Sequence, residues 1–309
     1  MKYNIEKIII GSRESKLAKA HIEIFKKEFY KKIIGSENLI VDSKFIKTTA
    51  DKFLDKNISE IGNKGLFTKE IDKEQINNNI HIGIHSLKDL PTKLKSGLEI
   101  LSVLKRGDHR DALYSEKACS LDQLKSDSVI GTSSIRRRNQ ILNLRPDIVI
   151  KDIRGNVDTR IKKLKEGKYD AIILSYAGIK YLQLENEISE SFTTKEIIPS
   201  AGQGIIALQC REDNQEIISI LKKINHDETY KRAHAERNIL KVLEGDCETA
   251  VGAHAIIDGE NIIVEAELFS LDGSKRFYEK KTEKIERFKE VGEEIGKILK
   301  IKSNNLYKR

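Results

Sequence analysis

Four polar side chains of different chemistry follow one short apolar run near residue 85. The β-branched run from Ile80 to Ile84 predicts a buried strand, and Pro91 ends regular structure a few residues later. Between them come an imidazole, a hydroxyl, an ammonium and a carboxylate, carried by His85, Ser86, Lys88 and Asp89. A turn at the end of a core strand is where α/β proteins place their chemistry, and a carboxylate beside a cation can anchor a charge or move a proton. The same residues also fit a plain turn with a surface ion pair.

Arginines at predicted strand ends form a second group suited to chemistry. Each lies at or just after the carboxyl end of a predicted parallel strand, and in an open α/β sheet such ends share one edge. They are Arg13, Arg136, Arg137, Arg138, Arg154 and Arg160. An arginine at a helix N-terminus opposes the helix dipole unless an anion arrives, so the pattern predicts a ligand with several carboxylates or phosphates. Arg138 is expected to point away from the others, and the alternative is a set of solvated basic helix starts.

The three cysteines are an odd number without metal-type spacing. The sequence has no CxxC pair, Walker A motif or cluster of metal ligands, so neither a zinc site nor a disulfide framework is predicted. Cys210 ends an apolar strand and Cys119 lies in a polar stretch, whereas Cys247 lies in a glycine-containing loop after a predicted helix. An accessible thiol there is a candidate nucleophile or attachment point, and the alternative is an inert loop thiol. No Cys–His dyad is evident, and His85 is interpreted as a hydrogen-bonded turn residue.

Composition bounds the class of protein. The chain has 309 residues, a net charge of +8, 39% hydrophobic and 34% charged residues, which is typical of a globular protein of two or three domains. No apolar run approaches the roughly 18 residues of a membrane span, and the first residues lack the apolar core of a signal peptide, so we expect a cytoplasmic protein. Positive charge favours anionic partners, but interspersed Lys and Glu, 6% aromatics and no Trp argue against nucleic acid.

The elements that must position these side chains alternate through the first two thirds of the chain. A strand, a polar turn and a helix recur without sequence repetition, which predicts an α/β fold built on parallel sheets. The expected strands are 7–10, 39–47, 80–84, 99–104, 128–130, 147–153, 170–174 and 205–209, and the expected helices are 16–32, 68–75, 135–144 and 157–165. Ser15 or Ser12 can cap the first helix, which places Arg13 in the preceding turn. The charged segment 106–111 is a candidate hinge into a second domain.

The last third of the chain changes character. A predicted helix, 229–243, precedes three predicted strands joined at Asp258-Gly259 and Asp272-Gly273, which are strong hairpin signals, and a terminal helix, 286–300, closes the chain. These elements predict a small α+β domain. The turn 198–204 and the strand after it are interpreted as the chain crossing back to complete the first domain.

Seven segments, in order and at matching spacing along the chain, resemble the porphobilinogen deaminase family, also called hydroxymethylbilane synthases. The segments are IHSLKDLPT, RGDHRDAL, IGTSSIRRR, IRGNVDTRIKKL, DAIILSYAGIK, IPSAGQG and AERNILKVLEGDC. The resemblance implies two lobes similar to type II periplasmic binding proteins and a small C-terminal α+β domain. It divides the chain into domain 1 at 1–104, completed by 199–222, domain 2 at 105–198, and a cofactor-attachment domain at 223–309. It also implies a cytoplasmic monomer.

The resemblance further implies a transferase with a covalent dipyrromethane cofactor, held by a thioether to Cys247. Four porphobilinogen molecules are joined head to tail with loss of ammonia, and water then releases the linear hydroxymethylbilane. Asp89 matches the catalytic aspartate. The matching cofactor- and substrate-binding residues are Arg13, Ser15, Lys64, Phe67, Ser86, Lys88, Ser134, Arg136, Arg137, Arg154, Arg160 and Gln203. Each pyrrole carries an acetate and a propionate, so the growing chain is a polyanion that suits the arginines.

The sequence departs from the family pattern at a few positions. Glu60 stands where some members have a basic residue, and Ala50 stands where many have glycine. Asp246 and Glu248 flank Cys247 and should disfavour its thiolate, although the attacking partner in attachment is an electrophilic cation. The alternatives that remain are a non-catalytic module that binds an anionic solute reversibly, and, on charge alone, a nucleic-acid binder with steep salt dependence.

Overall fold

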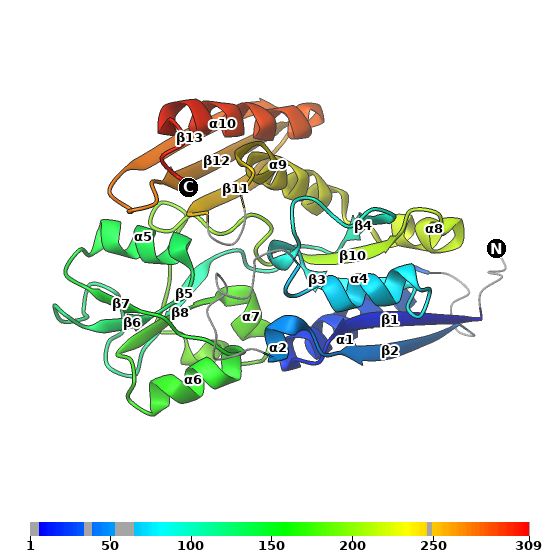
Figure 1. Cartoon of the computed structure of the whole chain (residues 1–309), viewed down its shortest axis with the longest axis horizontal. Helices are drawn as coiled ribbons and strands as arrows, with labels where there is room; N and C mark the ends of the chain where they lie inside the picture. Colours follow the sequence, from blue (N-terminus) through cyan, green and yellow to red (C-terminus); the bar gives the residue numbers. More distant parts are fainter. Residues whose placement is uncertain (1–5, 34–38, 53–64, 246–248, 309) are drawn as a thin grey trace. The chain divides into compact units, whose positions relative to one another are not determined.

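The computed structural model describes residues 6–33, 39–52, 65–245 and 249–308 (Figure 1). The chain forms two compact units, each built from two separate stretches. Unit 1 comprises Met1–Arg106 and Ile205–Tyr230, and unit 2 comprises Gly107–Gly204 and Lys231–Arg309. One boundary between the units lies at the start of the charged segment 106–111, and another lies at the end of the turn 198–204.

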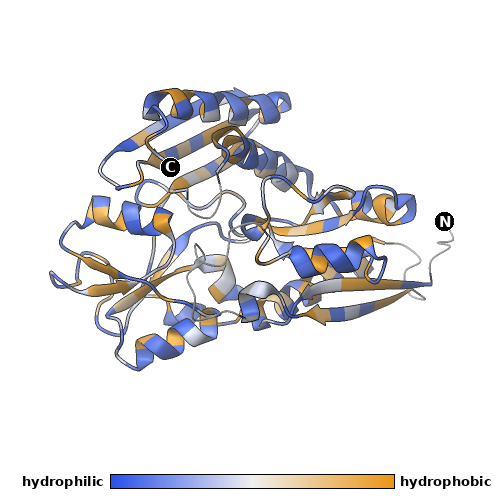
Figure 2. Cartoon of the chain, in the orientation of Figure 1, coloured by the Kyte–Doolittle hydropathy of each residue, from blue (hydrophilic) through white to orange (hydrophobic). Residues whose placement is uncertain are grey.

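Unit 1 contains one five-stranded sheet in the order β2-β1-β3-β10-β4. The strands are β1 (Lys7–Arg13), β2 (Ile40–Ile46), β3 (Ile82–Ser86), β4 (Leu98–Val103) and β10 (Ile206–Arg211). β1 runs parallel to β2 and β3, whereas β10 runs antiparallel to both β3 and β4. β10 is drawn mainly in hydrophobic colours in Figure 2, as expected for a strand whose side chains are buried on both faces of the sheet. β4 joins the sheet only through β10.

The described helices of unit 1 lie between or after the strands of this sheet in the sequence, and the longer ones pack on it. They are α1 (Lys16–Lys32), α2 (Thr49–Lys52), α4 (Lys69–Ile76), α8 (Gln215–Ile224) and the short 3-10 helix η1 (Leu87–Asp89). α1 begins after Ser15, whose Oγ accepts a hydrogen bond of 3.2 Å from the backbone N–H of Ala18. It buries Ile22, Phe25 and Phe29, and it packs against β1 and β3. α4 contacts the same two strands.

The first part of unit 2 contains a second five-stranded sheet, in the order β7-β6-β8-β5-β9. Its strands are β5 (Asp111–Tyr114), β6 (Val129–Gly131), β7 (Val149–Lys151), β8 (Ala171–Ser175) and β9 (Glu190–Ser191), and its helices are α5 (Ile135–Leu144), α6 (Val157–Lys165), α7 (Tyr176–Tyr181) and η2 (Glu185–Glu187). Alternate residues of β8 serve two cores: Ile173 packs in one cluster, and Ile172 and Leu174 in the other. Both faces of this sheet are therefore covered.

The last part of the chain builds a three-stranded antiparallel sheet in sequence order. Its elements are α9 (Asp227–Leu243), β11 (Val251–Asp258), β12 (Asn261–Phe269), β13 (Arg276–Lys284), η3 (Ile285–Arg287) and α10 (Phe288–Ser303). One core cluster joins the sheet to both helices through Ile239, Val264 and Ile295, among others. The two hairpins turn at the predicted Asp-Gly sites, with Gly259 at φ 57° and Gly273 at φ 75°, where glycine avoids backbone strain.

Three expectations from the sequence were wrong in detail. β1 does not stop at Ile10 but pairs with β2 as far as Arg13 and Ile46, so Arg13 ends a strand instead of lying in a turn. The first two sheets are mixed and not purely parallel, because β10 and β5 run antiparallel to their neighbours. The predicted arginines follow strands of two different sheets and therefore do not share one edge.

The crossing of α9 and α10 depends on glycine at position 292. A Cβ atom added at Gly292 would lie 2.1 Å from the backbone oxygen of Ala235 in α9. Because the obstacle is backbone, relief requires the two helices to move apart. We predict that Gly292→Ala lowers the free energy of unfolding by about 1–3 kcal/mol, despite the better helix propensity of alanine. Urea unfolding checks this, with Lys297→Ala on the exposed side of α10 as the control. An unchanged or raised stability would contradict it.

Candidate functional site

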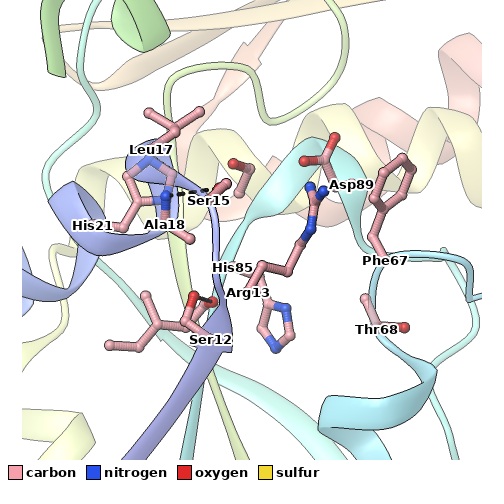
Figure 3. Close-up of a pocket in the computed structure, with 12 residues that line it drawn as sticks. Ser12, Arg13, Ser15, Leu17, Ala18, His21, Phe67, Thr68, His85 and Asp89 are labelled. Carbon is pink, nitrogen blue, oxygen red and sulfur yellow. Dashed lines mark hydrogen bonds between the residues drawn. The ribbon is translucent and has the colours of Figure 1, made fainter. Parts of the chain in front are cut away.

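A pocket of unit 1 opens where β1, β3 and η1 end beside the start of α1 (Figure 3). The side chain of Ser12 donates a hydrogen bond of 2.9 Å to the carbonyl of Ile84, which fixes the ends of β1 and β3 next to each other. The pocket is lined by Ser12, Arg13, Ser15, Leu17, Ala18, His21, Phe67, Thr68, Ile84, His85, Ser86 and Asp89. Five of these were predicted from the sequence as site residues: Arg13, Ser15, Phe67, Ser86 and Asp89.

Arg13 is held in this pocket by an aspartate of the short helix α2, which follows the neighbouring strand β2. Its Nη2 forms an ion pair of 2.5 Å with Oδ1 of Asp51, and its guanidinium lies 4.9 Å from the centre of the Phe67 ring. Asp51 also accepts hydrogen bonds from the backbone N–H and the hydroxyl of Thr48, at 3.1 and 2.7 Å. Burial raises the pKa of Asp51, but the hydrogen bond and charge of Arg13 outweigh this, so the pKa lies below its ordinary value. The guanidinium therefore has a fixed position and a permanent counter-charge.

Two buried histidines also line the pocket. His85 is 6% exposed and its Nε2 lies 3.1 Å from Oε1 of Gln209, while His21 is 5% exposed. Burial lowers the pKa of His85 to about 4; the Gln209 hydrogen bond opposes this and the charge of Arg13 adds to it. Burial, followed by the charges of Lys88 and His85, also lowers the pKa of His21 to about 4. Both imidazoles are neutral at physiological pH, so Arg13 is the cation among the lining residues, and the charge of Lys88 acts on His21.

The turn η1 presents Lys88 and Asp89. Leu87 and Leu90 on either side are buried, and the backbone N–H of Leu87 donates to the carbonyl of Ile205 at 2.9 Å, so the turn is anchored. Lys88 acts electrostatically on His21. In the part of the chain that the structure describes, the carboxylate of Asp89 has no hydrogen bond or ion pair with another residue. The alternative of a Lys88–Asp89 surface ion pair is therefore not what the described residues form.

The neutral histidines give unit 1 a defined acid sensitivity. The unfolded chain binds protons on both rings near the ordinary histidine pKa of about 6.5, whereas the folded chain does so only near 4, so stability is full above pH 6.5 and falls between the two values. We predict that wild type loses about 2 kcal/mol more unfolding free energy between pH 7 and pH 5 than His85→Gln does. Urea unfolding at both pH values measures this, with Asn143→Gln as the control. Equal losses in wild type and His85→Gln would contradict the prediction.

In unit 2, Arg136 and Arg137 lie buried around the carboxylate of Asp111. They occupy the first turn of α5, and they are 5% and 6% exposed, while Asp111 at the start of β5 is 0% exposed. Nη2 of Arg137 lies 2.6 Å from Oδ1 of Asp111, and Nη1 of Arg136 lies 2.7 Å from Oδ2. Burial opposes ionisation of Asp111, but the two arginines hold its pKa well below the usual range. These two predicted ligands are therefore anchored inside the unit.

The predicted polar neighbours in unit 2 also have structural partners. Gln203 is 0% exposed, and its Nε2 donates to Oδ1 of Asp111 at 2.8 Å and to the carbonyl of His109 at 2.9 Å. Ser134 is the N-cap of α5, and its Oγ accepts from the backbone N–H of Arg137 at 3.4 Å. Both side chains fix the backbone around the arginine pair.

Arg154 lies in the turn after β7, and Arg160 lies in the first part of α6. Nε of Arg160 donates to the carbonyl of Gly155 at 2.8 Å. Gly155 has φ 110°, and a Cβ atom there would lie 2.6 Å from Cγ2 of Thr159, so the turn requires glycine. Nε of Arg154 is buried without a hydrogen-bond partner among the described residues. A buried cationic donor of this kind fits a ligand that carries carboxylates.

Some predicted residues lie outside the described part of the chain, namely Lys64, Cys247, and the departures Glu60, Asp246 and Glu248. The described residues contain no group of three His, Cys, Asp or Glu side chains that could hold a metal ion. None of the helices in the described ranges is long and apolar enough to cross a membrane.

Sequence reasoning missed three residues that shape these sites: Asp51, Asp111 and His21. Asp51 and Asp111 were visible as carboxylates in charged segments near strand ends, but nothing in the sequence paired them with particular arginines. His21 lies on the apolar face of α1, where a single polar residue carries little signal.

Comparison with known proteins identifies the family of this chain. The sequence model described as "Porphobilinogen deaminase, dipyromethane cofactor binding domain" matches residues 8–219, and "Porphobilinogen deaminase, C-terminal domain" matches residues 230–301. The chain is 43% identical to the porphobilinogen deaminase of Syntrophomonas wolfei subsp. wolfei, over 85% of this chain and 86% of that protein. It is 40% identical to that of Oceanobacillus iheyensis, over 96% and 94%, respectively.

The chain therefore belongs to the porphobilinogen deaminase family. Among solved structures, the methionine-binding protein MetQ is similar with a TM-score of 0.46 and 12% identity, over 73% of this chain and 93% of that chain.

Proposed function

We propose that this chain is a hydroxymethylbilane synthase, a transferase that joins four porphobilinogen molecules head to tail with loss of ammonia. The products are the linear hydroxymethylbilane, released by water, and ammonia. The observation that carries the proposal is the pocket of unit 1, where the carboxylate of Asp89, which has no ion-pair partner among the described residues, shares the lining with the fixed guanidinium of Arg13. Membership of the family makes the alternative of a non-catalytic solute-binding module unfavoured.

The substrate chemistry explains why one pocket combines these two charges. Porphobilinogen carries an acetate and a propionate, and a guanidinium binds a carboxylate with paired hydrogen bonds. Arg13 and Lys88 would hold carboxylates in unit 1, with Ser15 and Ser86 as polar neighbours and the Phe67 ring beside the guanidinium. Because His21 and His85 are neutral, they add no positive charge of their own, and the carboxylates are left to Arg13 and Lys88.

Asp89 would serve the reacting carbon. Loss of ammonia from the aminomethyl group of porphobilinogen leaves a cation, which a carboxylate stabilises more strongly when no other cation neutralises it. The Oδ atoms of Asp89 have no ion-pair partner among the described residues, so they are available to face this cation. The same oxygens can take up the proton that a pyrrole carbon releases when the new bond forms.

The chain's own residues fit a dipyrromethane cofactor. The donor set of unit 2 is cationic, and the buried Nε of Arg154 lacks a partner among the described residues, which suits a group with several carboxylates. Arg136, Arg137, Arg154 and Arg160 would bind carboxylates of the cofactor or the substrate, with Ser134 and Gln203 beside them. When bound through Cys247, the cofactor supplies the terminal pyrrole to which the first substrate unit is added. Lys64 is proposed to contact the ligand as well.

We also propose three domains, at 1–104 completed by 199–222, at 105–198, and at 223–309. The three separate sheets support this division, because each has its own core of apolar residues. A cytoplasmic monomer without membrane or nucleic-acid partners remains part of the proposal. The low aromatic content of 6% supports the absence of a nucleic-acid role.

Cofactor attachment gives the first test of the function. We predict that the intact mass of the purified chain exceeds its sequence mass by a two-pyrrole adduct, and that Cys247→Ser removes both the adduct and the activity. Electrospray mass spectrometry of the intact chain measures the adduct independently of turnover. Cys119→Ser, which changes an exposed thiol, is the control and should keep adduct and activity. An active wild-type chain of unmodified mass would exclude this function.

The role of Asp89 gives a second test. We predict that Asp89→Ala lowers turnover of porphobilinogen by about 10²–10⁴-fold, the range typical for loss of a group that transfers protons, while the adduct stays present. Steady-state assays with intact-mass measurement separate the two effects. Asp213→Ala removes a largely exposed aspartate of the same unit, paired with Arg211, and should change turnover little. Near-normal turnover of Asp89→Ala would show that another group does this chemistry.

A further inference from the structure

Asp111 is the centre of a buried hydrogen-bond cluster in unit 2. Its Oδ1 accepts from Nη2 and Nε of Arg137, at 2.6 and 3.1 Å, and from Nε2 of Gln203 at 2.8 Å. Its Oδ2 lies 2.7 Å from Nη1 of Arg136, but no donor is well directed at Oδ2, so this contact is mainly an attraction of charges. One carboxylate thus joins three side chains, and each of them is a proposed ligand of the cofactor or the substrate.

The charges of this cluster do not cancel. Among the residues that the structure describes, two guanidiniums face one carboxylate, which leaves one positive charge without a described counter-ion. Glu267, which also acts on Arg136, is itself paired with Arg276, with Nε and Oε2 2.8 Å apart, so including that pair does not change the count. A buried charge without a counter-ion is unfavourable, and a carboxylate from a ligand would supply the missing one.

The two arginines are held in different ways. All three nitrogens of the Arg137 guanidinium have partners, because Nη1 donates to the carbonyl of Ile173 at 3.0 Å and the other two bond to Asp111. Arg136 uses Nη1 alone, toward the carbonyl of Ile198 at 2.9 Å and toward Asp111. Among the described residues, Nε and Nη2 of Arg136 therefore remain for another acceptor. A guanidinium edge of two N–H groups matches the two oxygens of a carboxylate.

We propose that Asp111 is a positioning residue for carboxylate binding: it fixes Arg137 and Gln203 and orients Arg136 so that its remaining N–H groups receive a carboxylate of the ligand. This inference rests on the proposed function. It narrows the role given above to the two neighbouring arginines: Arg136 binds the ligand, whereas Arg137, whose guanidinium nitrogens all have protein partners, supports the site. Asp111 itself does not touch the ligand.

The test is Asp111→Asn, which keeps the shape of the side chain and removes its charge. In the enzyme carrying its cofactor, the KM for porphobilinogen should rise at least about tenfold, with a smaller change in kcat, because Arg136 loses the charge that orients it. Asp147→Asn is the control. Asp147 pairs with Arg145 at 2.8 Å in the connection between α5 and β7, and the KM of this variant should not change. Unfolding in urea is measured for both variants to report stability separately.

A double-mutant cycle shows whether Asp111 acts through Arg136. Arg136→Lys alone should raise KM, and adding Asp111→Asn to Arg136→Lys should raise it much less than Asp111→Asn does in wild type. Independent, multiplying effects on KM would mean that Asp111 does not act through Arg136, and would overturn the proposal. In a matching cycle, Arg137→Lys is expected to lower the free energy of unfolding more than it changes KM.

Other outcomes also decide the proposal. An unchanged KM in folded Asp111→Asn overturns it. If Asp111→Asn does not fold, Asp111→Glu keeps the charge and displaces the carboxylate, so its KM should rise; if both fail to fold, Asp111 is a residue of the fold and the proposal is wrong. Wild type that carries no adduct and does not consume porphobilinogen would instead refute the proposed function, which distinguishes the two failures.

Discussion

The pairing of arginine with aspartate is the interaction on which both sites depend. In unit 1, Asp51 holds Arg13, and in unit 2, Asp111 holds Arg136 and Arg137. A flexible cation would lose side-chain entropy on binding each carboxylate, whereas a guanidinium already fixed by a carboxylate has lost it during folding. The pairing must also be incomplete, because full neutralisation would remove the attraction for an anionic ligand. In unit 2, two arginines on one aspartate meet both conditions.

Much of the secondary structure could be predicted because it depends on local signals. Helices α1, α5 and α6 follow polar turns with capping residues, and their bounds match the expected ranges 16–32, 135–144 and 157–165. The short helices and strands were harder to predict from the sequence. α7 and α8 were not predicted, and β5 has only four residues within a charged segment. The antiparallel strands β5 and β10 carry no local mark of their direction, since direction depends on strands that are distant in the sequence.

The sites were predictable in kind more than in arrangement. Residue types at strand ends indicated an anionic ligand, and the order of seven motifs indicated the family, which the relatives confirm. Partners across the sheet were not predictable. Asp111 lies 25 residues before Arg136 in the sequence, and only the order of strands β6, β8 and β5 brings it under the first turn of α5. His21 became significant only because α1 packs it beside Lys88 and His85.

The place of β10 in the first sheet has a consequence for synthesis on the ribosome. Strand β4 ends at Val103, yet it has no neighbour in its sheet until residues 206–211 have been made. The N-terminal sheet therefore cannot be completed while only the first hundred residues have emerged. Strand β10, which lies between β3 and β4, is made about another hundred residues later. Such long-range pairing slows folding and leaves an exposed edge open to wrong partners, so chaperone dependence in the cell is expected to arise in unit 1.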